Sequence, residues 1–151
     1  MYTHLEDFIQ ELYRKMSISR PSQLSIAKIA KRLNINVYFS DFSYRSDNNI
    51  IIKRSTRQKE WQLFGHEVCH YLKHCGSQLD MNSLFIDLQE YQANHFAYHF
   101  CVPTFMLEDL KEVNIHDVMD LFNVEYDFAL KRIEMYERKI ILARSYCKKR
   151  E

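Results

Sequence analysis

The sequence predicts one α+β domain that is mostly helical, with a small β-sheet or hairpin packed beside a central helix. Only 2 Gly and 2 Pro occur in 151 residues, so the chain is poor in the residues that favour tight turns. Apolar residues recur at helical spacing along most of the chain, and two short runs of β-formers interrupt them. No internal repeat or linker divides the sequence, which indicates a single domain over residues 1–151.

The N-terminal part of the chain predicts two helices. Thr3 and Glu6 have the spacing of a capping box, in which each side chain binds the other residue's backbone amide. A first helix then extends to about Met16, and Pro21 interrupts the chain. A second, short helix is indicated by four apolar positions: Ile26, Ile29, Ala30 and Leu33.

Two short strands are expected next. Residues 37–39 are Val-Tyr-Phe and residues 50–52 are three isoleucines, which are all residues that favour strands. A polar stretch, 46–49, lies between them and has the composition of a turn. The two strands can pair with the polar stretch as their connection, and no third strand is evident.

Two long helices are predicted after the strands. Residues 55–58 form a second capping-box pattern, which opens a helix from about Thr56 to His74, with Gly76 in a plausible C-terminal capping position. The second long helix covers roughly Ser83–Cys101 and is ended by Pro103.

The first long helix carries a pattern of metal-binding chemistry, His66-Glu67-Val68-Cys69-His70. Histidines four residues apart lie on one helix face about one turn apart, where both can bind the same zinc ion. Glu67 points about 100° round the helix from His66, so it can act on a water at the metal as a general base. Bulky apolar residues fall on the opposite side of the helix, which indicates one face for the core and one for chemistry.

A catalytic zinc site needs a third protein ligand. His74 lies about 12 Å along the helix axis from His66, too far to share one ion, and we interpret it as a helix-end residue. Glu90, on the next long helix, is the better ligand, and Asn94 one turn later can hydrogen-bond a metal-bound imidazole. A glutamate flanked by small residues suits a helix packed closely against another backbone, and Glu90 is flanked by Ala93 and Ala97.

These residues resemble the ImmA/IrrE family of metallopeptidases. The similarity consists of His66-Glu67-Val68-Cys69-His70, then Glu90-Tyr91-Gln92-Ala93-Asn94-His95-Phe96-Ala97, then Val102-Pro103. It extends loosely upstream and covers roughly residues 24–103, a motif-bearing core. Two or three C-terminal helices in residues 104–151 complete the expected domain.

The resemblance implies a zincin-like fold with a gluzincin-like site. One Zn²⁺ would be bound by His66, His70 and Glu90, and Glu67 would be the catalytic base. It also implies a site-specific cytoplasmic endopeptidase whose partner is a helix-turn-helix transcriptional repressor, cleaved to derepress a prophage or mobile element. The substrate-binding residues stay unknown, and the donor to the oxyanion stays open among four residues: Tyr91, His95, Tyr98 and His99.

Composition argues against several other classes. The net charge of +1 provides no long-range field for nucleic acid or an anionic membrane, and no apolar run is long enough to span a bilayer. The acidic N-terminal segment is unlike a signal peptide, which favours a cytoplasmic protein. Four scattered cysteines are then expected to be reduced thiols: Cys69, Cys75, Cys101 and Cys147.

Two alternative functions remain. Residues 115–135 could form a helix-turn-helix of a DNA-binding regulator, but the acidic residues there would face phosphates with the wrong charge: Asp117, Asp120, Glu125 and Asp127. Packing against the core or docking the substrate is the preferred role of these helices. The other alternative is a zinc-containing protein that binds and inactivates a repressor without cutting it.

Overall fold

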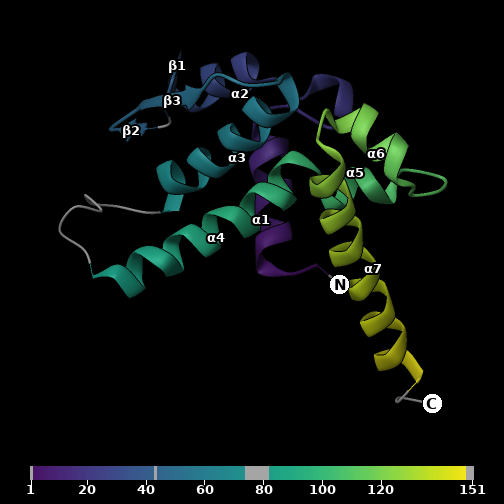
Figure 1. The fold of residues 1–151 in the computed structure, drawn as a ribbon. Helices are drawn as coiled ribbons and strands as arrows, with labels where there is room; N and C mark the ends of the chain where they lie inside the picture. The colour runs from purple at the N-terminus through teal and green to yellow at the C-terminus, as the bar shows by residue number, and fades with distance from the viewer. Residues whose placement is uncertain (1, 43, 74–81, 149–151) are drawn as a thin grey trace.

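The computed structural model describes residues 2–42, 44–73 and 82–148. Its elements are, in chain order, α1 (His4–Lys15), a 3₁₀ turn η1 (Pro21–Gln23), α2 (Ile26–Leu33), β1 (Asn36–Ser40), β2 (Tyr44–Ser46), β3 (Asn49–Lys53), α3 (Arg57–Lys73), α4 (Ser83–Cys101), α5 (Thr104–Glu108), α6 (Ile115–Phe122) and α7 (Tyr126–Lys148). The α+β class and the dominance of helices are confirmed. Figure 1 shows the small sheet and α2 above α3, while α4 and α7 extend below it.

The sheet has three strands in the order β1-β3-β2. β1 and β3 pair with each other, as expected, but they pair in parallel. The polar stretch therefore does not join them as a hairpin, which corrects the expected connection. The chain instead reverses between β2 and β3, where Asp47 has a left-handed φ of 49°, and β2 pairs antiparallel with β3. The polar stretch is thus a turn, but it follows a three-residue strand that the sequence did not indicate.

The helix boundaries agree closely with the sequence patterns. The capping box of Thr3 and Glu6 is present at the start of α1. At the start of α3 the cap is Thr56, whose hydroxyl accepts from the Lys59 amide at 3.1 Å. Residues 55–58 therefore do not form the predicted box; the carboxylate that accepts from the Ser55 amide belongs to Glu60. The predicted helix end at His74 and cap at Gly76 lie outside the described residues.

The core forms where α3 packs on α4, with α1 and α7 against α4 and the sheet against α3. Ile50 and Ile52 of β3 are fully buried beside α3. Tyr13 of α1 is buried and donates to the Phe100 carbonyl of α4 at 2.7 Å. These contacts hold the two helices that carry the predicted metal ligands from both sides.

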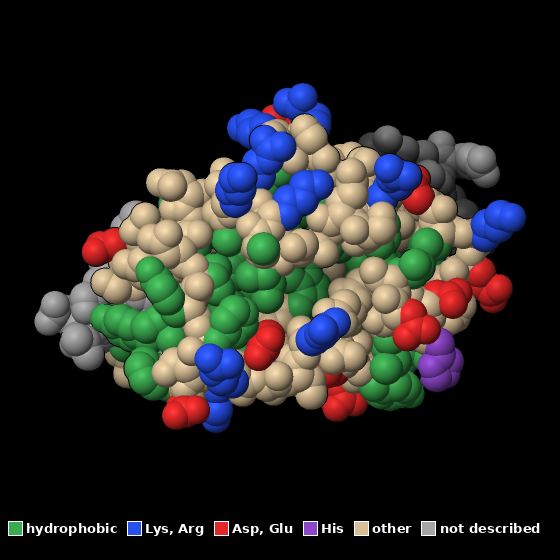
Figure 2. All heavy atoms as spheres, turned by 90° about the horizontal axis from the view of Figure 1, so that it is seen from above, with side chains coloured by type: hydrophobic (Ala, Val, Ile, Leu, Met, Phe, Trp, Pro, Cys, Tyr) green, Lys and Arg blue, Asp and Glu red, His purple; other side chains and the backbone are tan. Residues whose placement is uncertain are grey.

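The face seen from above in Figure 1 combines the sheet, α2 and α6. Figure 2 shows apolar side chains gathered across the middle of this face and towards the sheet end. Exposed aromatic side chains at the sheet end are Tyr38, Phe39, Phe42 and Tyr44. No helix of the described ranges is both long and apolar enough to cross a membrane.

Candidate metal centre

Two histidines of α3 present their ring nitrogens to the same point. His66 Nε2 and His70 Nε2 are 3.1 Å apart, and the two rings meet edge to face with centroids 4.8 Å apart. His70 is buried and His66 is half-buried. The spacing of four residues on a regular helix is sufficient to bring these atoms together.

Glu90 of α4 completes a group of three. Its Oε2 lies 3.1 Å from His66 Nε2 and its Oε1 lies 3.2 Å from His70 Nε2. Among the described residues, these three side chains form the group of histidine, cysteine and acidic residues whose ligand atoms all lie within 4.8 Å of one another. The sequence-predicted ligand set is therefore assembled in space, from two helices.

The three side chains fit a zinc ion. Tetrahedral Zn²⁺ with ligands at 2.0–2.1 Å places neighbouring ligand atoms about 3.3–3.4 Å apart. The two histidine nitrogens are 3.1 Å apart, which is close to this value. One carboxylate oxygen of Glu90 lies 3.1 Å from His66 Nε2 and the other lies 3.2 Å from His70 Nε2, so the carboxylate faces the point between the two rings. Two imidazoles and one carboxylate also leave one coordination position open, as catalytic zinc sites require.

Asn94 supports the ring of His66. Its Oδ1 lies 3.0 Å from Nδ1 of His66, and a carboxamide oxygen can only accept a hydrogen bond. The contact therefore favours the tautomer that carries its proton on Nδ1 and leaves a lone pair on Nε2 for a metal. The structure thus places Asn94 where the sequence analysis expected it.

Small residues let α3 and α4 approach closely enough for this geometry. A Cβ at Gly65 would lie 2.8 Å from Cys101 Sγ and 3.1 Å from Phe100 Cδ1. On the α4 side, Ala93 and Ala97 are buried. Side chains of ordinary size at these positions would separate the helices and move Glu90 away from the histidines.

Glu67 follows His66 on α3 and is half-buried. Cys69, also on α3, is buried, and its thiol lies 3.9 Å from the Gln92 carbonyl. Burial raises the pKa of Cys69 to about 12, and the charge of Lys73 only partly opposes this effect. The Cys69 thiol therefore stays protonated and does not compete as a thiolate ligand.

Residues 30–134 match the IrrE N-terminal-like domain of peptidase family M78. The chain belongs to this family. A protein named phage-like element PBSX protein XkdA, from Bacillus subtilis strain 168, is 40% identical in an alignment 148 residues long that covers 91% of this chain and 75% of that protein. The uncharacterized protein YqaB of the same strain is 36% identical in an alignment 149 residues long that covers 91% of this chain and 87% of YqaB. No solved structure gives a significant match.

The family match supports a metal-binding role for the three converging side chains. A metallopeptidase family is expected to bind a metal between such residues, and His66, His70 and Glu90 all lie within the matched range.

The expected candidates for an oxyanion donor separate into two environments. The rings of His95 and His99 on α4 are tilted by 57° to each other with centroids 4.9 Å apart, and Tyr98 packs on Phe128 of α7. Burial, together with the charges of Arg132 and His95, lowers the pKa of His99 to about 3. His99 is therefore a neutral core residue, whereas Tyr91 is exposed beside Glu90.

The C-terminal helices dock on α3. Asn123, with a left-handed φ of 53°, ends α6 and turns the chain into α7. Glu125 then accepts from Gln62 Nε2 at 2.9 Å and its amide donates to Gln62 Oε1 at 2.8 Å. The acidic residues Asp117, Asp120 and Asp127 are exposed. This arrangement favours core packing over phosphate binding for these helices.

Two of the four cysteines have side chains that the structure describes. These two, Cys69 and Cys101, are buried, and neither forms a disulfide within the described residues. Cys75 and the side chain of Cys147 lie outside what the structure describes.

Proposed function

We propose that this protein is a zinc-dependent endopeptidase that cleaves a helix-turn-helix transcriptional repressor and thereby derepresses a prophage or mobile element. The observation that carries the proposal is the convergence of His66 Nε2, His70 Nε2 and a Glu90 carboxylate oxygen on one point. The family match and the relative from a phage-like element support the peptidase and the mobile-element parts, respectively.

The residues have separate roles in the proposed reaction. His66, His70 and Glu90 would hold the ion, and Asn94 would keep His66 in the tautomer that binds it. A bound zinc ion supplies Lewis acidity, which polarises the scissile carbonyl and makes water a stronger acid. Glu67 removes a proton from the attacking water and delivers it to the leaving amine.

The position of Glu67 suits a base better than a ligand. It follows His66 directly, so its side chain leaves the helix about 100° away from that of His66. Glu90 would supply the third ligand from α4, so the proposed site does not need Glu67 as a ligand.

The test uses the full chain and, as candidate substrates, purified helix-turn-helix repressors of mobile elements from the same genome. We expect a discrete repressor fragment in the presence of zinc, and none after a chelator is added. Glu67→Gln should keep zinc but cleave about 10²–10⁴-fold more slowly, because it lacks a general base.

A second readout separates cleavage from simple binding. Repressor occupancy of its operator is measured with the wild-type protein and with Glu67→Gln. If the zinc-loaded variant relieves repression fully while the repressor stays intact, the protein is a binding antagonist and the peptidase proposal fails.

A further inference from the structure

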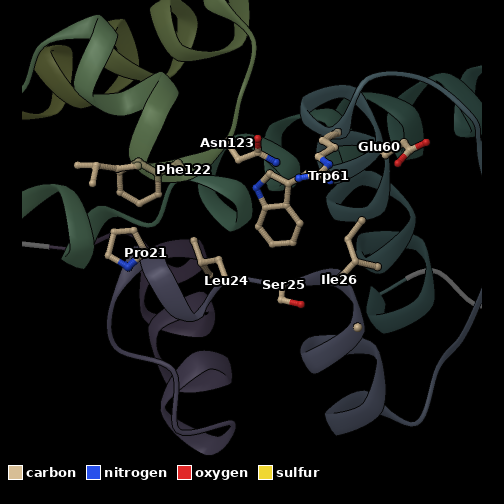
Figure 3. A pocket seen from close by; sticks show the side chains of 11 residues that line it. Pro21, Leu24, Ser25, Ile26, Glu60, Trp61, Phe122 and Asn123 are labelled. Atoms are coloured by element: carbon tan, nitrogen blue, oxygen red, sulfur yellow. The ribbon is translucent and has the colours of Figure 1, made fainter.

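A cavity lies beside the first residues of α3, away from the predicted metal ligands. Its volume is about 310 Å³, and it is formed where η1, the start of α2, the start of α3 and the end of α6 meet. Figure 3 shows the indole ring of Trp61 extending from α3 towards Leu24 and Ser25. Phe122 and Asn123 lie to the left of this ring in the same view. Cavities of about 300 Å³ and larger are the usual size for small-ligand sites.

The walls are mostly apolar, but they include an unpaired donor. Trp61 is only 4% exposed, and its indole Nε1 has no hydrogen-bond partner among the described residues. A buried N–H without an acceptor costs about 1–3 kcal/mol, and most such groups in proteins are paired. An acceptor on a molecule in this cavity would remove that cost.

Positive charge lies at the wall of the same cavity. Arg57 lines the cavity and is the first residue of α3, where the helix dipole is positive. No ion pair of Arg57 occurs within the described residues. Glu60 also lines the cavity, but its carboxylate accepts from the Ser55 amide, and Figure 3 shows it turned away from Trp61. Arg57 and the indole N–H of Trp61 therefore favour a ligand whose hydrogen-bond acceptor carries a negative charge.

The cavity is separate from the metal centre. Trp61 lies five residues before His66 on α3, which places it about 140° round the helix and about 7.5 Å along its axis. The residues that line the cavity include none of the three predicted metal ligands. A ligand here would contact the back of the same helix that holds His66 and His70.

We infer that this cavity is a second binding site, for a ligand that has an apolar group of leucine size and a carboxylate. The carboxylate would accept from Trp61 Nε1 and lie near Arg57, and the apolar group would contact Pro21, Leu24 and Phe122. Such a ligand is either a free acid or the C-terminal residue of a peptide. The inference does not depend on the peptidase activity.

Trp61 provides a direct readout because it is the sole tryptophan of the chain. The full-length protein has a single indole N–H signal in a proton–nitrogen NMR spectrum, and this signal is followed during titration. The probes are N-acetyl-L-leucine, its carboxamide, and N-acetyl-Ala-Ala-Leu with a free carboxylate. We expect a saturable shift with both acids and binding at least tenfold weaker with the carboxamide.

Variants locate the site. Arg57→Gln should weaken acid binding about tenfold, and Ala27→Leu, which adds bulk at a cavity wall, should abolish it. Arg138→Gln, an exposed charge change on α7, is the matched control and should bind like wild type. Circular dichroism and zinc content establish that each variant is folded.

The outcomes decide the inference. Tighter binding of the tripeptide than of N-acetyl-L-leucine identifies a peptide end as the ligand, and equal binding identifies a free acid. An indole signal that neither acid shifts overturns the inference. Equal binding of acid and carboxamide, or full binding by folded Ala27→Leu, also overturns it.

Discussion

Asn94 links the metal centre to the helix that supplies Glu90. Its oxygen accepts from Nδ1 of His66 at 3.0 Å, so it fixes both the tautomer and the orientation of that ring. Loss of a group that orients a metal-bound histidine typically lowers metal affinity about 10–100-fold. We therefore expect Asn94→Ala to weaken zinc binding by this factor while the fold is kept.

Competition with a chromogenic chelator measures this change. Asp87→Asn is the control, because Asp87 is an exposed residue of the same helix. Unchanged zinc affinity in Asn94→Ala would show that the hydrogen bond does not orient a ligand.

His99 makes the stability of the protein depend on pH. Burial and the nearby charges of Arg132 and His95 lower its pKa from 6.5 to about 3. Between these values the unfolded chain binds a proton that the folded protein does not bind, so stability falls as the pH falls below 6.5. The contribution of His99 between pH 7 and pH 5 is about 2 kcal/mol of lost stability.

Urea unfolding at pH 7 and pH 5, with a chelator present, measures this loss. His99→Phe should lose about 2 kcal/mol less than wild type over this interval, because phenylalanine does not titrate. His116→Gln, an exposed change on α6, should behave like wild type. An equal loss in His99→Phe and wild type would show that His99 titrates normally in the folded protein.

At the scale of elements, the contact between α3 and α4 is set by Gly65. An added Cβ would meet Cys101 Sγ at 2.8 Å and Phe100 at 3.1 Å. Overpacking of this kind costs about 1–3 kcal/mol, which exceeds the gain of up to about 1 kcal/mol from the helix propensity of alanine. Gly65→Ala should therefore lower the free energy of unfolding and weaken zinc binding.

A second substitution distinguishes crowding from other causes. Cys101→Ala removes the sulfur that the new Cβ would meet, so the double variant should recover at least half of the lost stability. No recovery in thermal and urea unfolding would contradict the packing explanation.

The sequence predicted the elements better than their pairing. The positions of the long helices follow from apolar spacing and from Thr56 and Pro103 near their ends, which act locally, although residues 55–58 do not form the predicted box. β2 was missed because three residues, Tyr44–Ser46, are too few to show an alternating pattern, and without it the parallel pairing of β1 and β3 could not be inferred.

The candidate site was predictable for a related reason. His66, His70 and Glu67 lie within one helix, and Glu90 could be placed by its alanine neighbours and by family resemblance. The cavity at Trp61 could not be predicted, because it is formed by segments that are distant in the sequence and meet only in the fold.

At the scale of the whole molecule, a buried polar network joins the N-terminal and C-terminal helices. Arg132 of α7 donates to the Val102 carbonyl and to Thr104, and Thr104 in turn donates to Glu6 of α1 at 2.6 Å. Lys139 of α7 also contacts Glu6, at 3.1 Å. Burial alone would raise the pKa of Glu6, but the hydrogen bonds from Thr104, the Thr3 amide and Lys139 lower it to about 2.

Removing the arginine should therefore affect the whole domain. Arg132 is only 1% exposed, and its loss would leave a buried carbonyl and hydroxyl without their donor. We expect Arg132→Met to lower the free energy of unfolding by about 3 kcal/mol in urea denaturation. Lys131→Met changes the exposed neighbour and should cost less than about 0.5 kcal/mol. Equal effects of the two substitutions would contradict this account.

The central claim is that one zinc ion is held between α3 and α4. It is tested most directly by metal analysis of the purified protein and of single variants. We predict about one zinc per chain in wild type, and less than about a tenth of that in His66→Ala and in Glu90→Ala, because two ligands hold zinc far more weakly than three. His116→Ala should keep the full content. Full zinc stoichiometry in folded His66→Ala or Glu90→Ala would contradict the proposed ligand set.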